Sequence, residues 1–217
     1  MIFLFNWFIK ITGWLPQLIL LKTKVHYEEK ASQNKRIKGK AIVVSNHNQV
    51  MDFAVLMFVF WRRTLRCAAA EILFRKNFIF TLFLKALGCV KVDRNEHDFS
   101  FLTKLQQILD KGGVVEMYPE SRLPKDGESR PIEFKPSYVY LALESGAPII
   151  PVFSNVKMCA KKRNDVIIGK AINVGDLYDP ALSEKENINN INIYVRSKII
   201  ELGKQLEEQK SKETSVL

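Results

Sequence analysis

The stretch SNHNQVMD (45–52) places a histidine and an aspartate directly after AIVVS (41–45), a β-branched run that predicts a buried strand. On a regular helix a step of five residues turns the chain by about 500°, so His47 and Asp52 would lie about 140° apart. The two side chains meet only if the backbone bends between them. An imidazole held by a carboxylate can act as a general base at neutral pH. The alternative is a polar turn at the end of a strand, because serine, asparagine and aspartate are all good capping residues.

The chain offers no nucleophile of its own for this pair. No serine lies in a G-x-S-x-G pattern, and neither G-x-x-x-x-G-K-[ST] nor G-x-G-x-x-G occurs. A histidine–aspartate pair can instead deprotonate a hydroxyl of the substrate. Arg94, Arg122 and Lys135 could hold an anionic group, since arginine binds phosphate with two parallel hydrogen bonds. These residues together predict acyl transfer to a hydroxyl of a phosphorylated acceptor at a membrane.

Segments with strand and helix patterns alternate along the chain, which predicts an α/β fold with a mostly parallel central sheet flanked by helices. The predicted strands are 24–29 (at an edge), 41–45, 64–70, 89–93, 114–120, 149–153 and 165–174. The predicted helices are 53–61, 72–88, 97–113, 136–148 and a tail from about 183, charged and frayed at its end.

Three polar clusters each follow a predicted strand. They are SNHNQVMD, DRNEHD and PESRLPKDGE. Ligands of open α/β sheets bind beyond the carboxyl ends of the strands, so we expect these clusters to gather into one site.

Composition indicates a single globular domain with an anionic partner. The chain has 217 residues, of which 47% are hydrophobic, and its formal net charge is +10. No recognisable nucleic-acid module interleaves the basic residues with exposed aromatics, so we expect an anionic membrane surface and no nucleic acid. Three scattered cysteines (Cys67, Cys89 and Cys159) and three dispersed histidines argue against disulfides and against a metal site.

The N-terminal run MIFLFNWFIKITGWLPQLILL is strongly apolar but lacks the basic start and cleavage site of a secretory signal. A spanning helix would bury Lys10 at mid-bilayer, at a cost of about 3 kcal/mol. Polar or small residues repeat along it at helical spacing: Asn6, Lys10, Gly13 and Gln17. We expect a helix, or two helices broken near Pro16, lying in one leaflet, with the basic run 22–40 facing anionic headgroups. The alternative is a buried core helix.

Four stretches, in order over about residues 40–155, resemble motifs of the 1-acylglycerol-3-phosphate acyltransferases and related lysophospholipid acyltransferases. The stretches are NHNQVMD, LGCVKVDR, YPESRLPKDGE and FKPSYVYLALESGAPIIPV. The positions that match the family pattern are Asn46, His47, Asp52, Gly88, Arg94, Pro119, Glu120, Arg122, Phe134, Lys135, Pro148 and Pro151. The resemblance implies a glycerolipid-acyltransferase-like α/β fold with an N-terminal membrane-associated helical element.

The resemblance also implies an activity. An acyl group would pass from acyl-CoA or acyl-carrier protein to the hydroxyl of lysophosphatidic acid, giving phosphatidic acid, with no bound cofactor and no covalent intermediate. His47 would deprotonate the hydroxyl and Asp52 would orient His47. The glycerol-phosphate end of the acceptor would be held by Arg94, Glu120, Ser121, Arg122 and Lys135. Asn46, Gly88, Pro119 and Pro151 would support the motifs.

This sequence departs from the family pattern near the acceptor site. Ser121 replaces the usual glycine, and Arg122 stands second after Glu120 instead of third. Gln49 replaces a common serine, and AAAE (68–71) has alanine where many members have lysine before the glutamate. The acceptor could therefore also be another lysolipid, an amino-acid lipid or a glycan. A second alternative is that the chain is a non-catalytic, basic membrane-binding protein.

The division of the chain follows from these patterns. We expect a membrane-interface helix or helix pair over 1–22, the acyltransferase domain over 23–182, and a C-terminal helix with a charged tail over 183–217. The protein would attach from one side, through its N-terminal helix, to the cytoplasmic face of the cell membrane.

Overall fold

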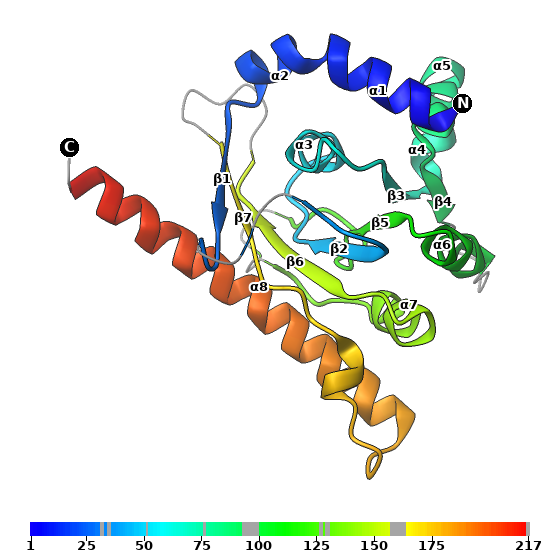
Figure 1. Ribbon diagram of the computed structural model, residues 1–217, viewed down its shortest axis with the longest axis vertical. Helices are drawn as coiled ribbons and strands as arrows, with labels where there is room; N and C mark the ends of the chain where they lie inside the picture. The colour runs from blue at the N-terminus through cyan, green and yellow to red at the C-terminus, as the bar shows by residue number, and fades with distance from the viewer. Residues whose placement is uncertain are drawn as a thin grey trace.

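A seven-stranded sheet runs through the protein in the order β1-β7-β6-β2-β5-β3-β4 (Figure 1). The computed structural model describes residues 1–30, 33, 36–50, 52–75, 77–92, 100–125, 128, 131–156 and 164–215. The strands are β1 Thr23–Tyr27, β2 Ala41–Ser45, β3 Leu65–Ala70, β4 Val90–Val92, β5 Val114–Met117, β6 Ile149–Ser154 and β7 Asn164–Ile168. All neighbours are parallel except β6 and β7. The predicted α/β fold with a mainly parallel sheet is confirmed, and β1 lies at an edge as expected.

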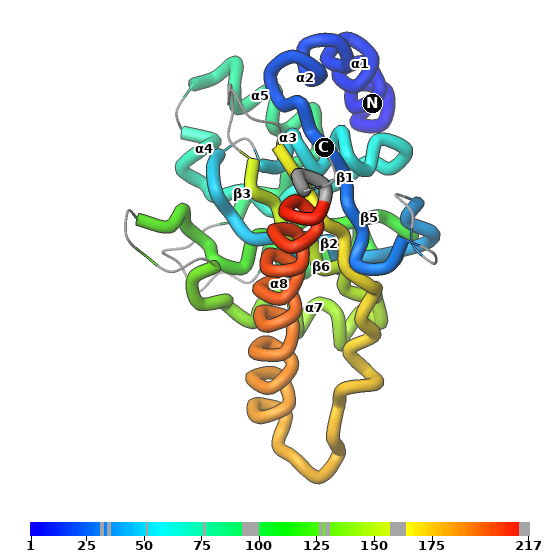
Figure 2. Tube along the Cα trace, turned by 90° about the vertical axis from the view of Figure 1, so that its left-hand side faces the viewer, coloured from blue at the N-terminus to red at the C-terminus, as the bar shows by residue number. Residues whose placement is uncertain are grey.

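Helices cover both faces of this sheet (Figures 1 and 2). They are α1 Ile2–Thr12, α2 Trp14–Leu20, α3 Asp52–Val59, α4 Glu71–Arg75, α5 Phe78–Leu87, α6 Ser100–Asp110, α7 Ser137–Ser145, α8 Glu184–Ser215 and a 3-10 turn at Val174–Leu177. Side chains of α6, α7 and α8 share one core cluster, and side chains of α3 belong to the cluster on the other face. The α1–α2 pair lies beyond α3, at the end of the molecule that also carries α5.

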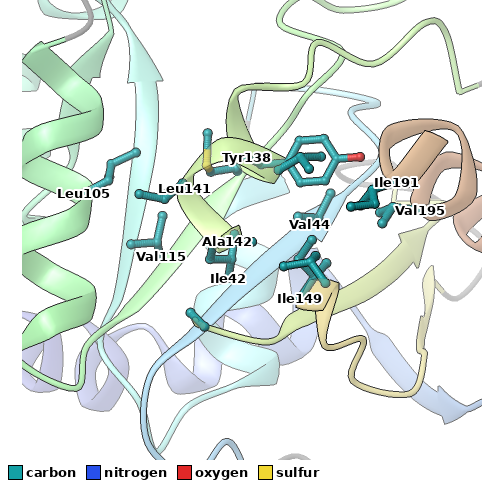
Figure 3. Packing of buried hydrophobic residues seen from close by; sticks show 14 of the residues in the cluster. Ile42, Val44, Leu105, Val115, Tyr138, Leu141, Ala142, Ile149, Ile191 and Val195 are labelled. Atoms are coloured by element: carbon teal, nitrogen blue, oxygen red, sulfur yellow. The ribbon is translucent and has the colours of Figure 1, made fainter. Parts of the chain in front are cut away.

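Strand β2 shows how the sequence builds both layers. Ile42 and Val44 point into the core under α7 and α8 (Figure 3), whereas Ala41 and Val43 point toward α3. Successive side chains of a strand alternate between the faces, so a run of β-branched residues can serve both cores at once. Every residue of β2 is buried. The polar stretch that follows β2 therefore begins at the centre of the sheet.

Two predicted elements differ from the structure. The single helix predicted over 72–88 is two helices, because the Asn77 side chain accepts a hydrogen bond from Ile79 N (2.8 Å) and so caps a new start. The strand predicted over 165–174 ends at Ile168. The next residue, Gly169, packs tightly against β6. A Cβ at this position would lie 2.8 Å from Pro151 Cγ. The predicted C-terminal helix is α8, which extends to Ser215.

The N-terminal helices turn their polar stripe toward the protein. Asn6 Nδ2 donates to Leu87 O (3.0 Å), and Lys10 Nζ donates to the carbonyls of Trp61 (2.8 Å) and Arg63 (2.6 Å). Burial lowers the pKa of Lys10 to about 8. Nine apolar side chains of this pair are 46–71% exposed: Phe3, Leu4, Phe8, Ile11, Trp14, Leu15, Leu18, Ile19 and Leu20. A buried core helix is therefore wrong for this segment.

The break in the N-terminal pair falls at Gly13 rather than near Pro16. The two helices meet there at a bend of 55°. A Cβ at Gly13 would lie 2.9 Å from the Phe58 ring, so this close approach requires glycine. Pro16 sits in the first turn of α2, where its missing N–H breaks no helical hydrogen bond. Among the described residues no single helix is long and apolar enough to cross a membrane. The two helices of this bent pair are together long and apolar enough to do so, judged by length and composition alone.

We predict that Lys10→Met loosens α1. Methionine fills the space of the lysine stem but leaves the Trp61 and Arg63 carbonyls without their donor, which costs about 1–3 kcal/mol. Amide hydrogen exchange in detergent micelles should speed up across 2–12 and stay unchanged in the sheet. The exposed Lys204→Met on α8 is the matched control. Identical exchange of α1 in both variants would show that the buried amine does not hold this helix.

Candidate active site

The Asp52 carboxylate gathers the turn that follows β2. Its Oδ2 accepts hydrogen bonds from His47 Nδ1 (2.9 Å), Asn48 N (2.7 Å) and Gln49 N (3.0 Å). Asp52 is the first residue of α3 and is only 1% exposed, and a carboxylate is favoured at a helix N-terminus. The backbone between His47 and Asp52 therefore bends as their contact requires. The polar turn and the histidine–aspartate pair are one structure.

This contact determines which histidine nitrogen can react. With Nδ1 held by the carboxylate, Nε2 is the nitrogen able to take a proton from a substrate. The His47 side chain is 17% exposed and borders an apolar pocket. The geometry fits a general base whose imidazolium form is stabilised by a buried carboxylate.

Glu120 fixes the histidine from the other side. Its Oε1 accepts from His47 N (2.7 Å) and its Oε2 accepts from Ile132 N (3.1 Å). Burial raises the pKa of Glu120. Because both oxygens accept backbone hydrogen bonds, the structure shows Glu120 as a clamp on the His47 backbone. Its contact with an acceptor stays a prediction.

The predicted acceptor cations are placed unequally. Arg122 borders the same pocket as His47 and pairs with Glu128 through two hydrogen bonds of 2.7 and 2.8 Å. That pairing raises the pKa of Arg122 and lowers the pKa of Glu128 to about 2. The Lys135 side chain is exposed and does not line the pocket, although its N–H donates to Pro119 O (3.0 Å). Arg94 lies outside the described residues.

The positions expected to support the motifs act on the conformation or the hydrogen bonds of the main chain. Asn46 Nδ2 donates to Ser154 O (2.9 Å) and Asn46 Oδ1 accepts from Ser154 N (2.8 Å), which extends the pairing of β2 with β6. Gly88 ends α5 at φ +80°, and a Cβ there would lie 2.5 Å from Arg66 Nε. Pro151 is buried within β6.

An apolar pocket of about 170 Å³ opens beside His47. It is lined by His47, Val50, Phe53, Cys67, Ala68, Ala69, Ala70, Ile72, Leu73, Leu84, Cys89, Tyr118, Arg122 and Leu123. The alanines of β3 leave this space open, and the position where many family members carry lysine is Ala70. An apolar chain whose polar end lies at His47 matches this lining.

The sequence analysis missed Tyr118, which lines the pocket, and Glu116, its hydrogen-bond partner. The Tyr118 ring packs against the His47 ring, with centroids 4.7 Å apart and planes tilted by 32°. Its hydroxyl donates to Glu116 Oε1 (2.5 Å), and Glu116 is 1% exposed. Burial raises the pKa of Glu116 to about 8. The available signal was a glutamate inside VVEMY, a strand otherwise suited to a core.

The sequence model of the family described as "Acyltransferase" matches residues 22–155, more than half of the chain. The chain belongs to the Acyltransferase family. This acyltransferase is 24% identical over 143 residues to human 1-acyl-sn-glycerol-3-phosphate acyltransferase beta. The match covers 65% of this chain and 51% of the human protein, so the chain spans about half the length of that relative. The predicted family is confirmed.

The acyltransferase fold also has a solved counterpart. The crystal structure of PlsC, the 1-acyl-sn-glycerophosphate acyltransferase of Thermotoga maritima, matches 93% of this chain and 79% of its own with a TM-score of 0.61. At 20% sequence identity this likeness establishes the fold alone.

Ser121 keeps the backbone that glycine would take. Its φ is +54°, in the left-handed region that costs a residue with a Cβ roughly 1 kcal/mol. We predict that Ser121→Gly raises the free energy of unfolding by a few tenths to about 1 kcal/mol, partly offset by the greater unfolded-state freedom of glycine. Urea unfolding measures this. As the control, Ser137→Gly in helix α7 should lower the free energy of unfolding. An equal decrease for Ser121→Gly would show that the backbone of Ser121 is not strained.

We predict that Glu116→Gln flattens the pH dependence of stability. In the unfolded chain this carboxyl ionises near the ordinary glutamate pKa of 4.5, whereas in the folded protein it keeps its proton until about pH 8. Between these values the folded state binds more protons, so the wild type loses stability as pH rises, by several kcal/mol in total. Glutamine still accepts from Tyr118 but cannot ionise.

Urea unfolding at about pH 5 and about pH 9 separates the two proteins, because only the wild type should lose the Glu116 contribution between them. Exposed Glu201→Gln is the control and should follow the wild type. Parallel stability curves for Glu116→Gln and the wild type would show that Glu116 is ionised throughout.

Proposed function

We propose that this acyltransferase moves a fatty acyl group from acyl-CoA or acyl-carrier protein to the free hydroxyl of lysophosphatidic acid, giving phosphatidic acid. The observation that carries the proposal is the 2.9 Å contact between His47 Nδ1 and Asp52 Oδ2 at an apolar pocket. The matched human protein and the Thermotoga maritima protein are both named for this acceptor class.

In the proposed reaction His47 Nε2 takes the proton of the acceptor hydroxyl, and the oxygen attacks the thioester carbonyl. The buried Asp52 carboxylate, 1% exposed, stabilises the imidazolium that forms. Collapse of the tetrahedral intermediate forms the ester, breaks the carbon–sulfur bond and returns the proton to the leaving thiolate. No enzyme atom becomes acylated, so the thiol and the ester are the only products.

The acceptor phosphate would bind at the polar side of the pocket. Arg122 already holds the two oxygens of Glu128 in parallel, and a phosphate can replace that carboxylate because both accept in the same geometry. Arg94 and Lys135 are the further predicted cations, while Ser121, with its φ of +54°, shapes the backbone next to Arg122. Glu120 acts on the acceptor indirectly, by fixing the backbone of His47.

The acyl chain would lie in the apolar pocket, and the protein would meet the membrane through its exposed apolar side chains. These belong to α1 and α2 and, on α5, to Phe78 and Ile79, which are 81% and 76% exposed. The basic run 22–40 would face anionic headgroups. We place the enzyme at the cytoplasmic face of the cell membrane, attached from one side.

A different hydroxylated lipid is the second candidate acceptor. The observation in its favour is that Ser121 and Arg122 depart from the family pattern at the polar side of the pocket. The chemistry at His47 would be the same.

We predict that His47→Ala lowers acyl transfer at least ~10²-fold, because the general base is lost. The assay is product formation in mixed micelles with lysophosphatidic acid, other lysophospholipids and amino-acid lipids, each with acyl-CoA and with acyl-carrier protein. Folding and vesicle binding should be unchanged.

The matched control is His26→Asn. It disrupts a second histidine–aspartate contact among the described residues, His26 Nε2 to Asp165 Oδ1 at 2.8 Å, on the β1–β7 side of the sheet. This variant should keep wild-type turnover if it folds. Full activity of His47→Ala would refute the mechanism. If the wild type forms product only with an acceptor other than lysophosphatidic acid, that acceptor becomes the substrate in place of the proposed one.

A further inference from the structure

A second cavity, a groove of about 750 Å³, opens at the β4 edge of the sheet. Its walls come from α4 and α5 on one side and from α6 on the other. Six cationic side chains line it: Arg66, Arg75, Lys85, Lys91, Lys104 and Lys111. Its volume lies in the range of ligand-binding clefts, and none of these six side chains has a role in the proposed reaction.

The positive charge of the groove is poorly balanced. The one acidic residue among its described lining is Glu71, which accepts from Arg75 Nη2 (2.9 Å) and Lys91 Nζ (3.0 Å). Arg66 Nε donates to the carbonyl of Gly88 (2.7 Å) rather than to a carboxylate. Six cations therefore face one carboxylate among the described lining residues, and a bound anion would relieve their mutual repulsion.

Apolar side chains adjoin the cations on helix α5. Thr81 and Lys85, one turn apart, line the groove. The neighbouring row of the same helix carries Phe78 and Leu82, which are 81% and 57% exposed. Ile72 of α4 is 65% exposed as well. Cationic and exposed apolar side chains thus lie next to each other, at the end of the molecule that carries α1 (Figures 1 and 2).

We propose that this groove binds the phosphate headgroup of an anionic phospholipid in the bilayer, with the acyl chains of that lipid lying over the Phe78–Leu82 face of α5. The inference rests on the proposed function only for the membrane location. The exposed apolar row favours a lipid over the nucleotide phosphates of coenzyme A, which would leave Phe78 and Leu82 unused. The lipid phosphate would add a second attachment point, beside α1 and α2.

The test compares two double charge reversals. Lys104→Glu with Lys111→Glu alters the α6 wall of the groove, and Lys185→Glu with Lys204→Glu makes the same change in net charge on α8, across the molecule from α5. All four lysines are exposed, so both proteins should fold. Binding is measured to phosphatidylcholine vesicles with and without phosphatidylglycerol.

We expect the groove variant to lose at least ~10-fold in affinity for the anionic vesicles, and the α8 variant to lose much less. Binding to neutral vesicles should match the wild type in both. Equal losses of affinity in the two variants would mean that only net charge matters, and would overturn the proposal. Unchanged vesicle binding with a raised KM for acyl-CoA would overturn it in favour of a donor site.

Failure of this proposal is distinguishable from failure of the proposed function. Acyl transfer to lysophosphatidic acid in uncharged detergent micelles does not need the groove. Transfer by a wild type that ignores anionic lipid would overturn the groove alone. Vesicle binding that depends on Lys104 and Lys111, without any transfer, would overturn the function alone.

Discussion

One oxygen atom, Oδ2 of Asp52, joins the scaffold to the chemistry. It accepts from two backbone N–H groups of the turn and from the His47 ring, so the bend after β2, the start of α3 and the orientation of the histidine depend on one buried acceptor. Glu120 repeats the device from β5, with a carboxylate oxygen on the His47 N–H. Two carboxylates thus hold one histidine, Asp52 by its ring and Glu120 by its backbone, which is the preorganisation that a general base requires.

The sheet order makes this convergence possible. Strands β2 and β5 are hydrogen-bonded neighbours, so the turn with His47 and the loop with Glu120 leave the sheet side by side. Tyr118, the residue after β5, packs its ring on the imidazole, while its hydroxyl donates to Glu116 within β5. A neutral Glu116 accepts that bond without placing another negative charge near Asp52, because two ionised carboxyls would repel each other in this dry interior.

Periodicity predicted the sheet, because the β-branched run AIVVS and the other strand patterns are local. The same local pattern left two readings of SNHNQVMD open, a capping turn and a histidine–aspartate pair, and the contact between His47 and Asp52 shows that both hold. The split between α4 and α5 was not predictable in the same way, since the apolar run continues across Asn77 and only the cap reveals the new helix. Nor was the direction of the Asn6–Lys10 stripe, because its partners are carbonyls near residues 61–63 and 87, far away in the sequence. The role of Glu116 depends on Tyr118, which strand alternation alone does not assign to it.

Helix α1 turns two polar side chains, Asn6 and Lys10, into the fold, while Phe3, Leu4, Phe8 and Ile11 lie on the outside. This exposed apolar surface is therefore part of the folded tertiary structure and does not need a bilayer to form. During purification we therefore expect this surface to need a detergent, because without one the exposed apolar faces of separate molecules can associate.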